Sequence, residues 1–281
     1  TFANNFRLLN DKFTIGDATN TGVITLQGIV NLAAGSRAIT MDSDAILSGS
    51  FIDDMQSENY AASAVAQGTL TKRGAAKLTL SGDNAFGLEV NDSVGGYLYK
   101  GSLVVESGTL QVGNGGTTGS LQGNIDNRAA LVFNRSDDIT YAAVISGSGT
   151  MNKQGAGKLI LSNNSTMSGL STVSQGTLIV NGSLAGSVQV NVGATLGGSG
   201  RIGGNVNVAG LHSPGNSPGV QTITGDLSYA ASSSVKWELS ANTVVQATPA
   251  VFDNIRVGGN LAFNGATSLG LSFVPSGTTV D

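Results

Sequence analysis

The 281-residue chain has a net charge of −4, scattered basic residues and no cysteine. Nucleic-acid binding is therefore not expected, because phosphate contacts need clustered Lys and Arg. Disulfides, thiolate metal sites and cysteine nucleophiles are excluded. Gly contributes 41 residues, and short apolar runs alternate with Gly, Asn, Ser and Thr, which is all-β composition. We find no signal peptide and no apolar run of about 18 residues that could form a transmembrane helix.

Short strands with one apolar face are predicted along most of the chain from alternation with a period of two. In chain order, the clearest of them are 23–26, 78–80, 103–105, 110–112, 159–161, 178–180 and 188–190. Gly, Asn-Gly or Ser-Gly follows nearly every one, and these residues tolerate positive φ, so the chain turns there. Residues 53–67 hold the nearest approach to a helical pattern, enough for a turn or two.

Two segments of the sequence are repeated in register. GTLTKRGAAKLTLSG at 68–82 matches GTMNKQGAGKLILSN at 149–163 with an offset of 81, and VESGTLQV at 105–112 matches VSQGTLIV at 173–180 with an offset of 68. The offsets differ by 13, so the first copy carries 13 additional residues within 83–101. In a solenoid each coil buries its apolar side against the next, and insertions leave the stack as loops. We therefore predict an all-β fold, a right-handed parallel β-helix with coils of about 20 to 25 residues.

The repeated unit reads Lys-x-Gly-Ala-x-Lys-Leu-x-Leu-Ser, then Val-x-x-Gly-Thr-Leu-x-Val, and resembles the passenger-associated transport repeat of bacterial autotransporters. Two copies match, at 68–112 and 149–180. The glycine-rich block that begins at Gly197, its Ser213–Gly219 turn and the strand pair at 252–261 are similar to the C-terminal part of such passengers. The lysines and glycines of the unit are expected at turns and coil edges of the stack.

This resemblance implies a type V secreted passenger of a Gram-negative bacterium, at the cell surface or secreted. It also implies an outer-membrane barrel at the C-terminus of the whole protein, which is not in this chain. On this basis, residues 1–199 are expected to form passenger coils with a loop insertion near 83–101. Residues 200–281 are expected to form the C-terminal coils and to support folding of the rest. No cofactor, catalytic residue or metal site is expected.

The residues that could carry chemistry each have a plainer interpretation. His212 is the sole histidine and lies in the turn sequence HSPGNSPG, so a turn or surface role is expected in place of Ser–His–Asp catalysis. The pairs Asp53–Asp54 and Asp137–Asp138 would point to opposite faces of a strand, so neither forms an acid/base dyad. Asp17 and the 42–44 segment could hold Ca²⁺ weakly, but the nonapeptide calcium pattern is missing.

The insertion within 83–101 is the predicted partner-contact loop, because exposed loops on rigid scaffolds carry recognition and Tyr is favoured at contacts. Its candidate contact residues are Phe86, Tyr97 and Tyr99. The expected partners are a host-cell surface or matrix, or identical passengers on neighbouring cells. We predict a non-enzymatic scaffold for adhesion, self-association or the display of other domains. A β-helix polysaccharide hydrolase or lyase and the scaffold part of a secreted toxin are the alternatives.

Overall fold

In a computed structural model, the chain is built from short strands, with no helix among the described residues. These residues are 1–9, 13–17, 19, 22–32, 36–52, 69–85, 89–90, 97–98, 102–216, 218–240 and 251–273. The predicted helical turns at 53–67 lie outside them. Nothing in the described ranges is a helix long and apolar enough to span a membrane. The chain divides into two compact units, residues 1–136 with 143–150 and residues 137–142 with 151–281.

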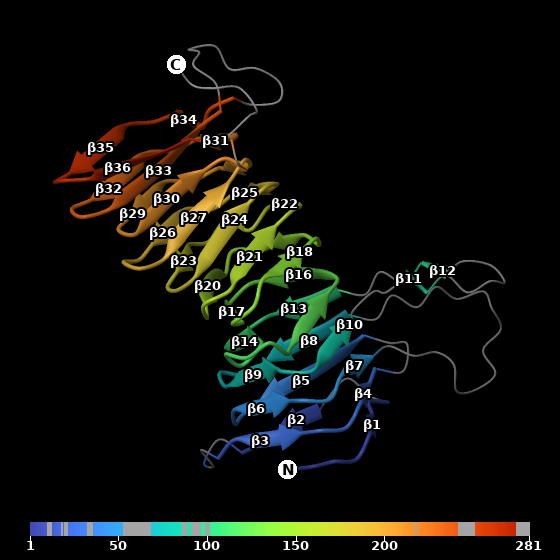
Figure 1. Cartoon of the computed structure of the whole chain (residues 1–281). Helices are drawn as coiled ribbons and strands as arrows, with labels where there is room; N and C mark the ends of the chain where they lie inside the picture. The colour runs from blue at the N-terminus through green and yellow to red at the C-terminus, as the bar shows by residue number, and fades with distance from the viewer. Residues whose placement is uncertain are drawn as a thin grey trace. The chain divides into compact units, whose positions relative to one another are not determined.

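In the first unit, parallel strands from successive coils lie side by side (Figure 1). The spatial order is β2-β5-β8-β13-β16-β19 on one face, β3-β6-β9-β14-β17 on a second and β1-β4-β7 on a third, and β10 pairs with β15. Its strands are β1 (Phe6–Arg7), β2 (Phe13–Ile15), β3 (Ile24–Leu26), β4 (Val30–Asn31), β5 (Arg37–Met41), β6 (Ala45–Leu47), β7 (Phe51–Ile52), β8 (Thr69–Arg73), β9 (Lys77–Leu80), β10 (Asp83–Ala85), β11 (Glu89–Val90), β12 (Tyr97–Leu98), β13 (Ser102–Val105), β14 (Thr109–Val112), β15 (Ser120–Gln122), β16 (Asn124–Asn127), β17 (Ala130–Asn134) and β19 (Ile145–Ser146).

The second unit has the same organisation, with three parallel sheets. Their spatial orders are β20-β23-β26-β29-β32-β35, β18-β21-β24-β27-β30-β33-β36 and β22-β25-β28-β31-β34. Its strands are β18 (Ile139–Tyr141), β20 (Thr150–Gln154), β21 (Lys158–Leu161), β22 (Asn164–Ser165), β23 (Ser171–Val173), β24 (Thr177–Val180), β25 (Ser183–Leu184), β26 (Val188–Val190), β27 (Thr195–Gly198), β28 (Arg201–Ile202), β29 (Val206–Val208), β30 (Leu211–Pro214), β31 (Val220–Ile223), β32 (Leu227–Ala230), β33 (Ser234–Leu239), β34 (Asn254–Val257), β35 (Leu261–Asn264) and β36 (Ser268–Phe273).

The core of each unit is a set of apolar lines that run from coil to coil. In the second unit Leu159, Leu178 and Leu196 pair in register and are all fully buried. Because side chains alternate between the two faces of a strand, every second residue of each coil joins such a line. The fold class is the predicted one, an all-β parallel β-helix, and all seven strands predicted above are present as β3, β9, β13, β14, β21, β24 and β26.

Coil length varies more than the prediction of about 20 to 25 residues allowed. Thr195 pairs with Leu211, 16 residues later, whereas Leu227 pairs with Leu261, 34 residues later. The strands keep their register in both cases, so the difference is taken up in the connections between the sheets.

Candidate functional site

The predicted contact loop begins where the chain leaves the stack after β10. Asp83–Ala85 pairs in parallel with β15, and the next stacked strand, β13, begins at Ser102. Between them, β11 and β12 form a separate two-stranded sheet, the one antiparallel pairing among the strand pairs that the structure describes. Tyr97 lies in β12, while Phe86 and Tyr99 fall outside the described residues. Their role in contacts stays a prediction.

The second repeat shows how the same position is closed when no insertion is present. By the two offsets, residues 86–101 of the first copy correspond to 167–169 of the second. Met167 in this short connection is fully buried, so the connection covers core. The insertion of the first copy is therefore an addition to a coil that the second repeat completes without it.

His212 was predicted to be a turn or surface residue, and this is wrong: its ring is fully buried in β30. Its Nδ1 lies 2.7 Å from the Tyr229 hydroxyl oxygen, and its Nε2 lies 2.6 Å from Oε1 of Gln221. The Gln221 amide nitrogen donates to the carbonyl of Gly197 at 3.0 Å, so its oxygen faces the ring. Nε2 therefore donates to Gln221 and Nδ1 accepts from Tyr229.

Burial lowers the pKa of His212 to about 4, so the ring is neutral at pH 7. Both ring nitrogens are already hydrogen-bonded, so neither is free to activate a serine or to bond a carboxylate. Since His212 is the sole histidine of the sequence, the chain holds no histidine free for a Ser–His–Asp triad.

Two of the aspartates, each located before one of the repeats, cap equivalent turns of the two repeats. Asp44 accepts a hydrogen bond from the Lys77 backbone nitrogen at 2.8 Å, and Asp138 accepts one from that of Lys158 at 2.9 Å. Asp138 also lies 3.1 Å from the Lys158 ammonium, and these hydrogen bonds lower its pKa, the backbone one most strongly. Both carboxylates therefore stabilise the backbone just before a stacked strand.

Among the described residues, the other candidate acids, together with the buried Asp253, do not gather into one site. Asp253 is fully buried and accepts hydrogen bonds from the backbone nitrogens of Gly219 and Glu238, while burial raises its pKa. Asp17 accepts from the backbone and hydroxyl of Thr19. The pair Asp53–Asp54 lies outside the described residues. Within the described ranges, no three His, Asp or Glu side chains converge as metal ligands would.

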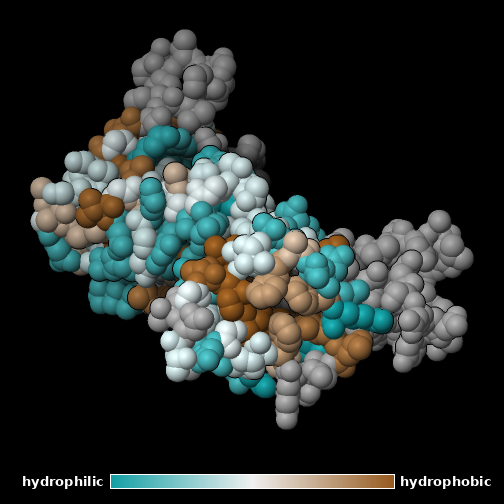
Figure 2. Space-filling model, turned by 90° about the horizontal axis from the view of Figure 1, so that it is seen from below, coloured by the Kyte–Doolittle hydropathy of each residue, from teal (hydrophilic) through white to brown (hydrophobic). Residues whose placement is uncertain are grey.

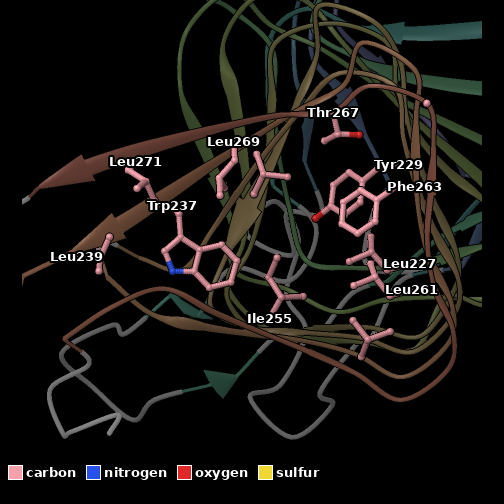
Figure 3. Close-up of a pocket in the computed structure, with 13 residues that line it drawn as sticks. Leu227, Tyr229, Trp237, Leu239, Ile255, Leu261, Phe263, Thr267, Leu269 and Leu271 are labelled. Atoms are coloured by element: carbon pink, nitrogen blue, oxygen red, sulfur yellow. The ribbon is translucent and has the colours of Figure 1, made fainter. Parts of the chain in front are cut away.

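The last described coil of the second unit carries an apolar cavity of about 730 Å³ (Figure 3). It is lined mainly by aliphatic and aromatic side chains, with the Tyr229 and Phe263 rings stacked at 5.2 Å. The lining residues of β35 and β36 continue core lines: Leu261 pairs with Leu227, and Leu271 pairs with Trp237. The cavity is thus the inner surface of the final coil, with few polar groups for chemistry.

The first coils of the first unit also expose apolar side chains. Phe2 is 55% exposed, Val23 is 58% exposed and Ile29 is 39% exposed. Figure 2 looks from below onto the end where these coils lie and shows hydrophobic residues gathered in the middle of that face.

The repeated unit identifies the family of this chain. The family model of the passenger-associated transport repeat matches residues 70–112 and 151–180, the two copies described above. The chain is a segment of an autotransporter passenger. Such a passenger lies at the cell surface of a Gram-negative bacterium or is secreted.

Two curated proteins are similar to this passenger segment. The adhesin BmaC autotransporter of Brucella suis biovar 1 (strain 1330) is 36% identical over 191 residues, which cover 65% of this chain and 6% of that protein. The extracellular serine protease of Serratia marcescens is 35% identical over 99 residues, 35% of this chain and 10% of that protein. The segment therefore spans a small part of the length of each relative. No solved structure matches it significantly.

The feature of the passenger that sequence reasoning missed is the burial of the first lysine in each repeat. Lys72 and Lys153 were expected at turns or coil edges, yet they are 0% and 1% exposed. The signal was present in the alternation, because Lys72 is two residues after the core residue Leu70 and so shares its inward face.

Proposed function

We propose that this passenger segment is a non-enzymatic β-helical scaffold that acts in adhesion through the insertion within 83–101. The observation that carries the proposal is the insertion itself. It stands at a position of the repeated unit that the second copy spans with only residues 167–169. Loops displayed on a rigid scaffold are where recognition is concentrated. The similarity to a protein named an adhesin, over 65% of this chain, supports the same function.

The arrangement around His212 supports a non-enzymatic role. Its two ring nitrogens are occupied by Tyr229 and Gln221, so a histidine-dependent serine nucleophile has no base in this segment. The similarity to an extracellular serine protease covers 35% of this chain, and we propose that it reflects shared passenger coils and not shared chemistry.

The proposed partners are a host-cell surface or matrix, or identical passengers on neighbouring cells. We propose that export uses the outer-membrane barrel typical of the family, and that residues 200–281 support folding of the remaining coils. The family supports the first proposal, and the way each coil rests on its neighbour supports the second.

The test is to replace residues 86–101 with Met-Ser-Gly, the connection found at 167–169 of the second repeat. We expect an unchanged melting temperature and a loss of adhesion when the passenger is displayed on cells. A second variant, the triple substitution Phe86→Ser, Tyr97→Ser and Tyr99→Ser, keeps the loop length and removes the candidate contact side chains, so it should lose adhesion as well. Adhesion to host cells, adhesion to matrix and cell–cell aggregation are measured separately to identify the partner. Undiminished adhesion and aggregation in the replaced passenger would exclude the insertion from the function.

A further inference from the structure

The two repeats each bury a charged amine in the core. Lys72 lies in line with Ile39 and Val105, its register partners in β5 and β13. Lys153 lies in line with Val173 of β23. A buried charge is costly unless it is fully bonded. The ion pairs that the structure describes involve neither lysine, so the compensation must come from elsewhere.

Backbone carbonyls provide it. The ammonium of Lys72 donates to the carbonyls of Gly74 at 2.8 Å, Ala76 at 2.5 Å and Ser107 at 2.7 Å. An ammonium has three N–H donors, so all three are used.

The second repeat builds a similar cage. The ammonium of Lys153 donates to the carbonyls of Gln154 at 2.9 Å, Gly155 at 2.9 Å and Gln175 at 3.3 Å. In each copy, one acceptor is the glycine two residues after the lysine, and the third acceptor belongs to the next coil. The remaining acceptor differs: it is Ala76 in the turn of the first copy and Gln154, the last residue of β20, in the second. The third acceptor, Ser107 or Gln175, stands directly before the glycine of the second repeated segment.

That glycine is needed to form the cage. Gly108 and Gly176 both have φ of 68°, a conformation that side chains other than Gly rarely adopt. A Cβ on Gly108 would collide with the Lys72 ammonium and the Gly74 carbonyl, and one on Gly176 would collide with the carbonyls of Gly155 and Gly157. The two repeated segments, which are separate in sequence, are therefore the two halves of one site.

We propose that the first lysine of each repeat is an internal cation that locks the register of two successive coils, held by a carbonyl cage that only correct stacking assembles. Apolar lines cannot provide this lock by themselves. A slip of two residues keeps every inward side chain inward, because the period of a strand is two. The same slip moves the third carbonyl by about 7 Å along the strand and leaves a buried ammonium without its partner.

The charged groups around each cage are also equivalent. Asp44 acts on Lys72 and Asp138 acts on Lys153, in each case favouring the ammonium form. Burial lowers the pKa of both lysines to about 8, so both keep their charge at neutral pH.

The first experiment uses the unaltered passenger and reductive methylation of its lysines at pH 7.5, followed by peptide mass spectrometry. Lys158, half-exposed in the same repeat as Lys153, is the internal reference. We expect Lys72 and Lys153 to react at least about tenfold more slowly than Lys158, since they react only when a cage opens. Equal rates would overturn the proposal.

The second experiment compares Lys153→Met with Lys158→Met by hydrogen exchange. We expect Lys153→Met to speed exchange of the 174–177 amides, in the next coil, by about tenfold or more, because the cross-coil bond is lost. Lys158→Met should change the same amides by less than about threefold, as an exposed side chain does. Indistinguishable exchange in the two variants would show that Lys153 does not stabilise the next coil. If Lys153→Met does not fold, Gly176→Ala, which disturbs the same cage, is compared with Gly193→Ala by exchange of the same amides, and equal exchange in these two variants overturns the proposal.

Discussion

The coils that carry the repeats and the last coils of the second unit both bury a basic side chain, but they hold it differently. Lys153 is bound by backbone carbonyls of two coils, and its pKa of about 8 leaves it charged. His212 is bound by the side chains of Tyr229 and Gln221, and its pKa of about 4 leaves it neutral. A cage made of backbone needs only a lysine and glycine-permitted turns, so it can recur as a repeat. A network of three specific side chains occurs here once among the described coils.

The largest expected effect is a difference in acid sensitivity between the two regions. The folded pKa of His212 lies below its unfolded value of 6.5, so the unfolded chain takes up the proton first as pH falls. The stability due to the neutral ring is complete above pH 6.5 and is lost between pH 6.5 and pH 4, by about 3 kcal/mol. The repeat lysines stay charged in both states across this window. Hydrogen exchange at pH 7 and pH 5 should therefore show β30 weakening and β21 unchanged.

The control for acid sensitivity is His212→Gln. Asp253 acts in the opposite direction, because burial raises its pKa and the folded state takes up that proton first. The His212→Gln variant keeps Asp253 but loses the titrating ring, so its β30 protection should no longer fall between pH 6.5 and pH 5. If the variant weakens with acid as much as the unaltered chain, His212 is not the sensor.

A slightly smaller effect is expected at the cage glycines. Gly176→Ala should lower the free energy of unfolding by about 2 kcal/mol or more, because it adds both backbone strain and a collision with two carbonyls. Gly193→Ala is the matched control: Gly193 has φ of 81° but nothing within 4 Å of a Cβ, so only strain, about 1 kcal/mol, is added. Denaturant titration measures both. Equal losses would mean that the cage is not tightly formed.

The smallest effect is expected at the capping aspartates. Asp138→Asn keeps an oxygen to accept from the Lys158 backbone nitrogen, whereas Asp138→Ala removes it. The ion pair between Asp138 and Lys158 is half-exposed and contributes little. Asp138→Ala should therefore lower the melting temperature, by less than Gly176→Ala does, and Asp138→Asn should barely change it. A clear fall in the melting temperature of Asp138→Asn would instead show that the negative charge of Asp138, which also acts on Lys153, contributes to stability.

The sequence was informative wherever local spacing decides the outcome. The offsets of 81 and 68 located the insertion, and period-two alternation located the strands. Alternation also placed Lys72 on the face of Leu70, but its third acceptor, Ser107, comes from the next coil and is set by stacking. His212 was misassigned because HSPG reads locally as a turn. Its partners in the neighbouring coils, Leu196 and Val235, make the strand continue through it and point it inward.

Because each coil touches only its neighbours, tension applied along such a stack passes through every coil boundary in series. The stack then gives way at its weakest boundary, whatever the strength of the others. A lysine that donates to the next coil adds a charged hydrogen bond at that boundary, as Lys72 does to Ser107 and Lys153 to Gln175. The repeat therefore strengthens the boundary between the two coils that its lysine joins, and with it the resistance of the stack to tension.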